Sequence, residues 1–157
     1  MSTLRLLLIG LIVALFLGAE AFIPEKPTVD VYPPTPNLSG AATVRIGSST
    51  IQVKLAMTPE SQAKGLGGVS TIAPDEGMLF VFTPAYHDSF WNKEMRIPFD
   101  LLWIADGNVI GLEENVREEA AGIRYLDAPA PVDYVLEVQG GWALRHGVKK
   151  GDSVSIF

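Results

Sequence analysis

Three residues in one short stretch have side chains suited to recognising a ligand. Trp91 and Lys93 lie two residues apart, so in an extended strand both point to the same side, and Asp100 follows just after the Ile97-Pro98 break. An aromatic ring beside a cation and a carboxylate is suited to binding a sugar, a peptide or a small anion. We therefore expect Trp91, Lys93 and Asp100 to form a contact surface.

The same three residues also allow a purely structural interpretation. Large aromatic side chains are usually buried, so Trp91 would belong to the core and Lys93 would pair with Asp100 to hold the turn. Asp100 would equally serve by accepting hydrogen bonds from backbone N–H groups that the Ile97-Pro98 break leaves unpaired. The sequence leaves these alternatives open.

Glu137 is the fourth candidate binding residue, because it interrupts the apolar segment Tyr134–Val138. A carboxyl group among apolar neighbours has a raised pKa and can act as an acid or a base. The alternatives are a side chain facing solvent, or an ion-pair partner for Lys93 or Arg145. Together with Asp100, Glu137 would provide the two carboxylates of a glycosidase.

Other kinds of catalytic chemistry find little support in the residue types. The chain has no cysteine, which excludes disulfides, thiolate metal ligands and a cysteine nucleophile. The two histidines, His87 and His146, lie far apart, and an oxygen-rich metal site would need the scattered residues Asp88, Glu94 and Asp100 to converge. Since no nucleophile elbow or phosphate-binding glycine loop is present either, we expect no metal, no cofactor and no catalytic residue.

The charge of the chain argues against nucleic acid as a partner. Its formal net charge is -6, from 12 basic and 18 acidic residues, and Lys149-Lys150 is the only adjacent basic pair. Nucleic-acid binding needs clustered Lys and Arg to displace counterions from phosphates. The expected partner is instead a small molecule, a glycan or a protein of the cell envelope.

The first 21 residues resemble a secretory signal. Arg5 precedes the apolar run 6–19, and Ala19-Glu20-Ala21 places small residues where a signal peptidase cuts. The run is shorter than the roughly 20 residues of a membrane-spanning helix. We expect residues 1–21 to be a signal peptide or an N-terminal membrane anchor, with a membrane tether through residues 4–23 as the second option, and the protein to be exported.

A proline-rich spacer follows over residues 22–40. Five prolines lie between Pro24 and Pro36 with polar residues among them, and proline favours extended, semi-rigid backbone. The spacer is expected to separate the N-terminal segment from a single folded domain at residues 41–157.

Short strands dominate the pattern of that domain. We expect a hairpin of residues 43–46 and 51–55, a short helix that begins at Thr58-Pro59-Glu60 and ends at Gly65, and a second short helix at residues 142–146. Further strands are predicted at residues 78–82, 89–95, 100–105, 109–112, 134–138 and 154–156, with a long connection over 113–131. The predicted fold is mainly β: a small β-sandwich or barrel-like domain with two short helices.

Four segments together resemble one known family. They are Thr58-Pro59-Glu60 leading to Gly65-Leu66, residues 75–82, residues 90–100, and residues 134–138 with 147–152. In this order they are similar to the bacterial and archaeal family of domain of unknown function 192, over roughly residues 42–156. The resemblance implies a small β-rich domain, often exported, with no established activity.

The chain departs from the family pattern at two places. The family has Met and then a basic residue after the Gly-Leu pair, whereas this chain has Gly67, Gly68 and Val69. The family also has Met between the Trp and the Lys, whereas this chain has Asn92.

The leading functional hypothesis is a non-catalytic binding or interaction module in the cell envelope. Trp91, Lys93, Asp100 and Glu137 are its predicted binding residues. The alternative is a hydrolase that acts on envelope polysaccharide through Asp100 and Glu137 as paired carboxylates.

Overall fold

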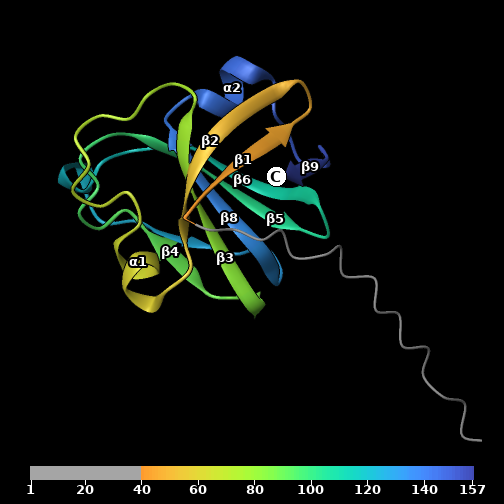
Figure 1. The fold of residues 1–157 in the computed structure, drawn as a ribbon. Helices are drawn as coiled ribbons and strands as arrows, with labels where there is room; N and C mark the ends of the chain where they lie inside the picture. Colours follow the sequence, from red (N-terminus) through yellow and green to blue (C-terminus); the bar gives the residue numbers. More distant parts are fainter. Residues whose placement is uncertain (1–39) are drawn as a thin grey trace, which may run out of the picture. The chain divides into compact units, whose positions relative to one another are not determined.

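The structure, a computed structural model, describes residues 40–157, so the predicted signal or anchor segment and nearly all of the spacer lie outside the described part. The described residues form a mainly β domain, as predicted (Figure 1). In chain order its elements are β1 (Ala41–Ile46), β2 (Ser49–Ala56), α1 (Pro59–Lys64), β3 (Glu76–Tyr86), β4 (Ser89–Trp91), β5 (Phe99–Ala105), β6 (Asn108–Val116), the 3₁₀ helix η1 (Glu119–Ala121), β7 (Tyr125–Asp127), β8 (Val132–Gln139), α2 (Trp142–His146) and β9 (Val154–Ile156).

Seven strands make one curled sheet, in the order β6-β5-β8-β3-β2-β1-β9. β2 and β3 run parallel, with α1 in the connection between them, and the other neighbours are antiparallel. The sheet curls until its edge strands β6 and β9 touch at one end, where Val109 donates to the Asp152 carbonyl at 2.9 Å and Val154 donates to the Gly107 carbonyl at 2.8 Å. The result is a half-barrel (Figure 1).

The two faces of this sheet bury two separate hydrophobic clusters. The inner cluster takes residues from β1, β2, β3, β5, β6 and β8, and Trp142 of α2 packs into it. The outer cluster lies on the other face, where the segment after α1 and the small two-stranded sheet of β4 and β7 cover the central strands. Adjacent residues of β5 show the division, because Leu101 belongs to the outer cluster and Leu102 to the inner one.

Most predicted elements form where the sequence indicated. The hairpin, both short helices and the last strand are present, and α1 begins with Thr58 as the capping residue. Thr58 and Ser61 satisfy each other's backbone N–H groups, which fixes the start of this short helix.

The segment after β5 is more structured than the sequence indicated. β6 continues to Val116, which pairs with Phe99 beyond a register shift, so the predicted connection 113–131 loses its first residues to the sheet. The rest of that connection holds η1 and β7. Conversely, the predicted strand 89–95 stops at Trp91, because Met95 donates to the Asn92 carbonyl in a turn and Glu94 has a φ of 62°.

Within residues 40–157, no helix has the length and apolar character that crossing a membrane requires.

Candidate functional site

A cavity of about 410 Å³ opens on the outer face of the sheet. α1, β3, β4 and β7 surround it, and β8 contributes Glu137 to its lining. Six aromatic side chains line the cavity: Phe80, Phe82, Tyr86, Phe90, Trp91 and Tyr125. It therefore combines apolar walls with a few polar groups, as small-molecule sites generally do.

Edge-to-face contacts hold the aromatic wall in place. The ring of Phe90 stands edge-on to Phe80 at 4.9 Å and to Trp103 at 5.5 Å between centroids, and Phe82 stacks on Tyr86 at 4.5 Å. These are favourable geometries for aromatic pairs. Because Trp103 belongs to the outer cluster, the wall is continuous with the core and is rigidly supported.

The first side of the cavity is set by α1. Gln62 donates through Nε2 to the backbone oxygens of Val81 at 2.9 Å and Ala56 at 3.4 Å, which ties the helix to β3 and to the end of β2. The helix ends at Gly65, whose φ is 50°. A Cβ atom there would lie 3.1 Å from both Glu137 Oε2 and Phe80 Cζ, so glycine lets the backbone approach Glu137 closely.

Glu137 is almost completely buried, with 3% of its surface exposed. Its partners across the sheet, which share its face, are Met78 on β3 and Leu101 on β5, so its neighbours within the sheet are apolar. Burial raises the pKa of Glu137 from 4.5 to about 7, and a hydrogen bond from the backbone N–H of Leu66 opposes that rise. The carboxyl group therefore titrates near neutral pH.

Only one oxygen of Glu137 has a protein partner. Leu66 donates to Oε2 at 3.1 Å, whereas Oε1 has no hydrogen bond from any residue of 40–157. Since no side-chain nitrogen or oxygen in this part of the chain is both fully enclosed and unpaired, Oε1 must reach the cavity that Glu137 lines. A buried acid thus presents a free oxygen to whatever enters.

Trp91, Lys93 and Tyr125 form the mouth of the cavity. Trp91 is 44% exposed and Tyr125 is 64% exposed, and their rings meet edge-to-face at 6.2 Å. Lys93 Nζ lies 6.0 Å from the centre of the Trp91 ring. The structural interpretation of Trp91 as a core residue is therefore wrong, and Trp91, Lys93 and Glu137 line one cavity.

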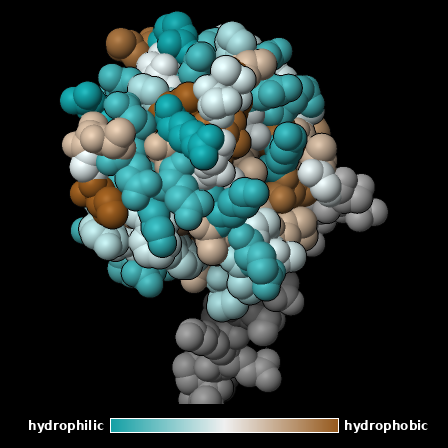
Figure 2. Space-filling view, turned by 90° about the vertical axis from the view of Figure 1, so that its left-hand side faces the viewer, coloured by the Kyte–Doolittle hydropathy of each residue, from teal (hydrophilic) through white to brown (hydrophobic). Residues whose placement is uncertain are grey.

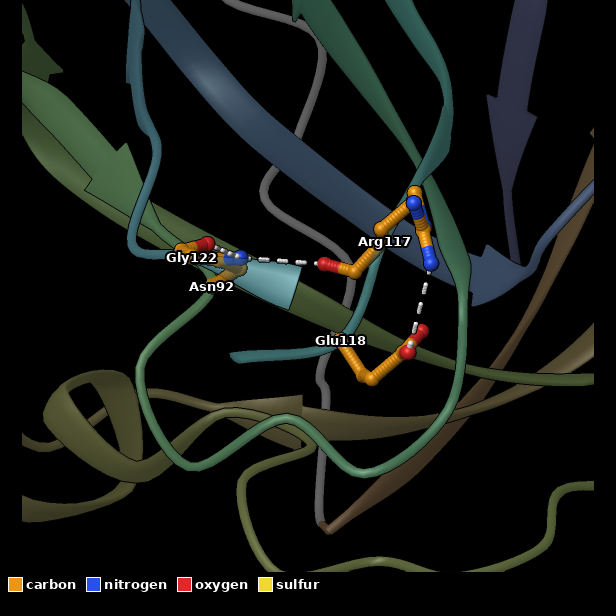
Figure 3. Close-up of polar contacts among 4 residues, drawn as sticks. All are labelled: Asn92, Arg117, Glu118 and Gly122. Atoms are coloured by element: carbon orange, nitrogen blue, oxygen red, sulfur yellow. Dashed lines mark hydrogen bonds and ion pairs between the residues drawn. The ribbon is translucent and has the colours of Figure 1, made fainter. Parts of the chain in front are cut away.

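Asn92, between Trp91 and Lys93, holds the outer wall in position. Its buried side chain donates through Nδ2 to the carbonyls of Arg117 at 3.0 Å and Gly122 at 2.8 Å (Figure 3). Its Oδ1 accepts from the backbone N–H of Arg124 at 2.7 Å. In the same segment the Arg117 guanidinium reaches toward Glu118 at 3.9 Å (Figure 3). Asn92 therefore fixes the segment that leads directly into Tyr125, and the Met-to-Asn departure from the family pattern has a structural consequence.

Asp100 lies elsewhere and has a structural role. It is fully buried and accepts three backbone hydrogen bonds, from Asn115 at 2.6 Å, Gly141 at 2.9 Å and Ala143 at 2.8 Å. Two of these donors belong to the start of α2, whose first N–H groups have no partner within the helix. Asp100 therefore caps backbone donors, as one sequence interpretation proposed, but the donors come from α2 and β6 rather than from the Ile97-Pro98 break.

The two candidate carboxylates do not form a pair. In the antiparallel register of β5 and β8, Asp100 lies opposite Val138 and Leu101 lies opposite Glu137. Partners opposite each other share a face and successive residues alternate, so Asp100 and Glu137 point to opposite faces of the sheet. A glycosidase mechanism that uses both is excluded, and the predicted pairing of Lys93 with Asp100 is likewise absent from residues 40–157.

The described residues contain no group of three or more His, Asp or Glu side chains placed to hold a metal ion. The residues considered for an oxygen-rich site are separately engaged. Asp88 accepts from the backbone N–H of Ser89 at 2.8 Å, Glu94 lies in the turn after β4, and Asp100 caps α2.

Several lining residues had no clear signal in the sequence. Tyr125 lies in the segment read as a connection, where Tyr125-Leu126-Asp127 is too short an alternation to indicate a strand. Phe80 and Phe82 were expected as parts of a central strand, without a role in a site. Gly65 was read as a helix stop, and only its proximity to Glu137 shows the second role.

Residues 42–156 match the family DUF192, described as "Uncharacterized ACR". The chain belongs to the DUF192 family. The match covers every strand from β2 to β9 and most of β1, so the cavity lies within the family's domain. No curated protein matches the chain.

Two crystal structures are similar to this DUF192 domain. One is a protein of unknown function from Novosphingobium aromaticivorans, with 33% identity, a TM-score of 0.65, and coverage of 73% of this chain and 83% of that one. The other, from Sinorhizobium meliloti, is named a "putative transcription regulator", with 34% identity, a TM-score of 0.67, and coverage of 75% of this chain and 95% of that one. These descriptions belong to those proteins.

Proposed function

We propose that this DUF192 domain is a non-catalytic binding module of the cell envelope, and that its ligand is a small molecule held in the cavity beside Glu137. The observation that carries the proposal is the free Oε1 of the buried Glu137 inside an aromatic-walled cavity. Glu137 is a largely buried acid whose Oε1 is open to the cavity and has no partner among residues 40–157, so a ligand in the cavity can supply the polar contact that the protein does not.

A small ligand fits these observations better than an envelope protein does. The cavity is about 410 Å³, within the size range of small-molecule sites. On the face shown in Figure 2 most residues are hydrophilic and the hydrophobic ones lie in small separate patches. That face offers no broad apolar centre of the kind that a stable protein interface buries.

The proposed location rests on the N-terminal sequence, which lies outside the described residues. Arg5, the apolar run and the Ala19-Glu20-Ala21 exit support export. Fractionation of cells that express the chain tests the location: we expect it in the periplasmic, membrane or secreted fraction, and recovery in the cytoplasm alone would contradict the proposal.

A thermal-shift screen of the purified chain against small molecules tests the binding function. We expect compounds that raise the melting temperature and also change Trp91 fluorescence, because Trp91 stands at the mouth of the cavity. Trp91→Ala should weaken their affinity at least about tenfold, which corresponds to one well-packed aromatic contact.

Leu144→Ala is the matched control, because Leu144 is an apolar side chain with 77% exposure on α2, away from the cavity lining. Its affinity for the same compounds should equal that of the unmodified chain. Hits whose affinity is unchanged by Trp91→Ala, or is lowered equally by Leu144→Ala, would count against the cavity as the binding site.

A further inference from the structure

We infer that the ligand carries a positively charged amine, which pairs with Glu137 Oε1, on an aromatic or apolar body that packs against the cavity walls. This inference rests on the proposed function and names the ligand's chemical class.

The first support is the lack of a positive charge where the acid is buried. Glu137 lies between Met78 and Leu101 in the sheet, and its one protein partner among residues 40–157 is the neutral N–H of Leu66. A carboxylate in such a place is poorly stabilised unless a cation accompanies it. A ligand amine would supply the missing charge at Oε1.

The aromatic walls give the second support. The faces of aromatic rings carry negative electrostatic potential and attract cations, and cages of aromatic side chains are a general means of binding ammonium groups. Lys93 Nζ already lies 6.0 Å from the Trp91 ring, which shows that the mouth of the cavity accommodates an ammonium group. An anionic ligand would instead bring its charge toward the ring faces and the Glu137 carboxyl.

The charged groups of the rim do not reverse the preference of the cavity for a cationic ligand. Lys64 at the end of α1 and Lys93 after β4 line the cavity, but both are exposed, and exposed charges contribute little to binding. Asp88 lines the same rim with a negative charge and offsets one of them. Of the ionisable residues that line the cavity, Glu137 alone is buried.

Pairing with an ammonium group implies that the Glu137 carboxyl releases one proton. In the empty cavity burial favours the protonated carboxyl, because it raises the pKa of Glu137 to about 7. When an ammonium group binds, the carboxyl releases its proton to solvent and keeps the amine as its partner. An amine should therefore bind more tightly as the pH rises through 7, whereas a ligand that accepts a hydrogen bond from the protonated acid should bind less tightly.

Calorimetric titration of the full chain with three matched probes tests this inference. The probes are phenethylamine, its uncharged N-acetyl derivative, and 3-phenylpropionate, which share one ring and differ in charge. We expect phenethylamine to bind about tenfold more tightly at pH 8 than at pH 6, with proton release in buffers of different ionisation enthalpy, because Glu137 changes from mostly neutral to mostly ionised between these values. The other two probes should bind more weakly at pH 8.

Glu137→Gln is the decisive variant, because glutamine keeps the oxygen that accepts from Leu66 and removes the titratable charge. It should abolish the pH dependence and weaken phenethylamine binding at pH 8 at least about tenfold, by the loss of one ion pair.

Other titratable groups lie near the cavity. Tyr86 and Tyr125 line it, and burial raises the pKa of Tyr86 from 10.0, which is above the tested pH range. His87→Asn is the control, because His87 is exposed beside the rim residue Asp88 but does not line the cavity, and it should leave the pH dependence intact.

The outcomes separate the inference from the proposed function. Equal binding of the amine and its acetyl derivative, with loss of both in Trp91→Ala, would overturn the cationic class and leave the cavity as a binding site. Phenethylamine binding that survives Glu137→Gln unchanged would also overturn the inference. If no probe binds and the small-molecule screen finds no ligand that depends on Trp91, both the inference and the proposed function fail.

Discussion

Glu137 couples the charge of one side chain to the stability of the domain. Burial raises the pKa of its carboxyl from 4.5 to about 7, so the folded chain holds a proton that the unfolded chain releases. Below about pH 4.5 the group is neutral in both states and does not oppose folding. Between pH 4.5 and 7 the unfolded chain ionises first, so the free energy of unfolding falls as the pH rises, and the full loss is present above 7.

We therefore predict that Glu137→Gln stabilises the empty domain at high pH. The loss of free energy of unfolding between pH 4.5 and 8 is about 3 kcal/mol for this one group, and glutamine removes it. Urea unfolding at pH 5 and pH 8 measures the difference. Glu114→Gln, at an exposed position on β6, is the control and should keep the pH dependence of the unmodified chain. An unchanged pH dependence in Glu137→Gln would show that Glu137 is not the titrating group.

Asp100 is buried like Glu137, but its oxygens are fully engaged by backbone donors. We predict that Asp100→Asn lowers the free energy of unfolding by about 3 kcal/mol, because the amide turns a donor toward N–H groups that need an acceptor. Ligand affinity of the folded variant should not change, since Asp100 points to the opposite face from the cavity. Asp133→Asn is the control, because it affects a single exposed hydrogen bond, which Asp133 accepts from the backbone N–H of Asp106. It should lower the free energy of unfolding by less than about 1 kcal/mol. Urea unfolding and calorimetric titration distinguish the two effects.

At the scale of elements, the end of α1 decides how close the backbone comes to the site. Gly65 and Gly68 both have positive φ, but a Cβ at Gly65 meets Glu137 and Phe80 at 3.1 Å, whereas a Cβ at Gly68 meets nothing within 4 Å. A non-glycine residue at either position would therefore have the same conformational penalty of roughly 1 kcal/mol, but only at position 65 would its Cβ press against neighbouring atoms.

We predict that Gly65→Ala loses more stability than Gly68→Ala and also weakens ligand binding. The added methyl group pushes against the Glu137 carboxyl and narrows the cavity, whereas Gly68→Ala carries the backbone strain alone. Thermal unfolding measures the stability difference, and calorimetric titration with a cavity ligand measures the affinity. Equal affinities in the two variants would mean that the end of α1 does not shape the binding site.

The elements predicted from sequence are those whose signals are local. α1 has a capping threonine, a proline and a terminal glycine in one short stretch, and β2 alternates apolar and polar residues within itself. β7 has three residues and depends on pairing with β4, from which it is separated by the whole of β5 and β6. Its formation depends on contacts between distant segments, which no local pattern shows.

At the scale of the whole molecule, sheet register decides which candidate residues meet. The alternation of side chains along β8 places Val135 and Glu137 on one face and Leu136 on the other, but it cannot relate β8 to β5. Only the observed register, in which Leu101 lies opposite Glu137, shows that Asp100 and Glu137 point to opposite faces of the sheet. Trp91, Lys93 and Glu137 could therefore be selected from the sequence, but which of the four candidates share a site could not.

The two faces of the sheet lead to the last prediction, which compares two adjacent residues of β5. Leu101 and Leu102 are both fully buried, but Leu101 shares its face with Glu137 and Leu102 faces Leu136 in the inner cluster. We predict that Leu101→Ala and Leu102→Ala each lower the free energy of unfolding by about 3 kcal/mol in one cooperative transition, because a single sheet carries both clusters. Only Leu101→Ala should alter ligand affinity and the pH dependence set by Glu137, since the space it leaves lies beside that carboxyl. Urea unfolding, monitored by both fluorescence and circular dichroism, measures the stability of each variant, and calorimetric titration measures its ligand affinity. Separate unfolding transitions for the two clusters would show that the sheet does not couple its faces.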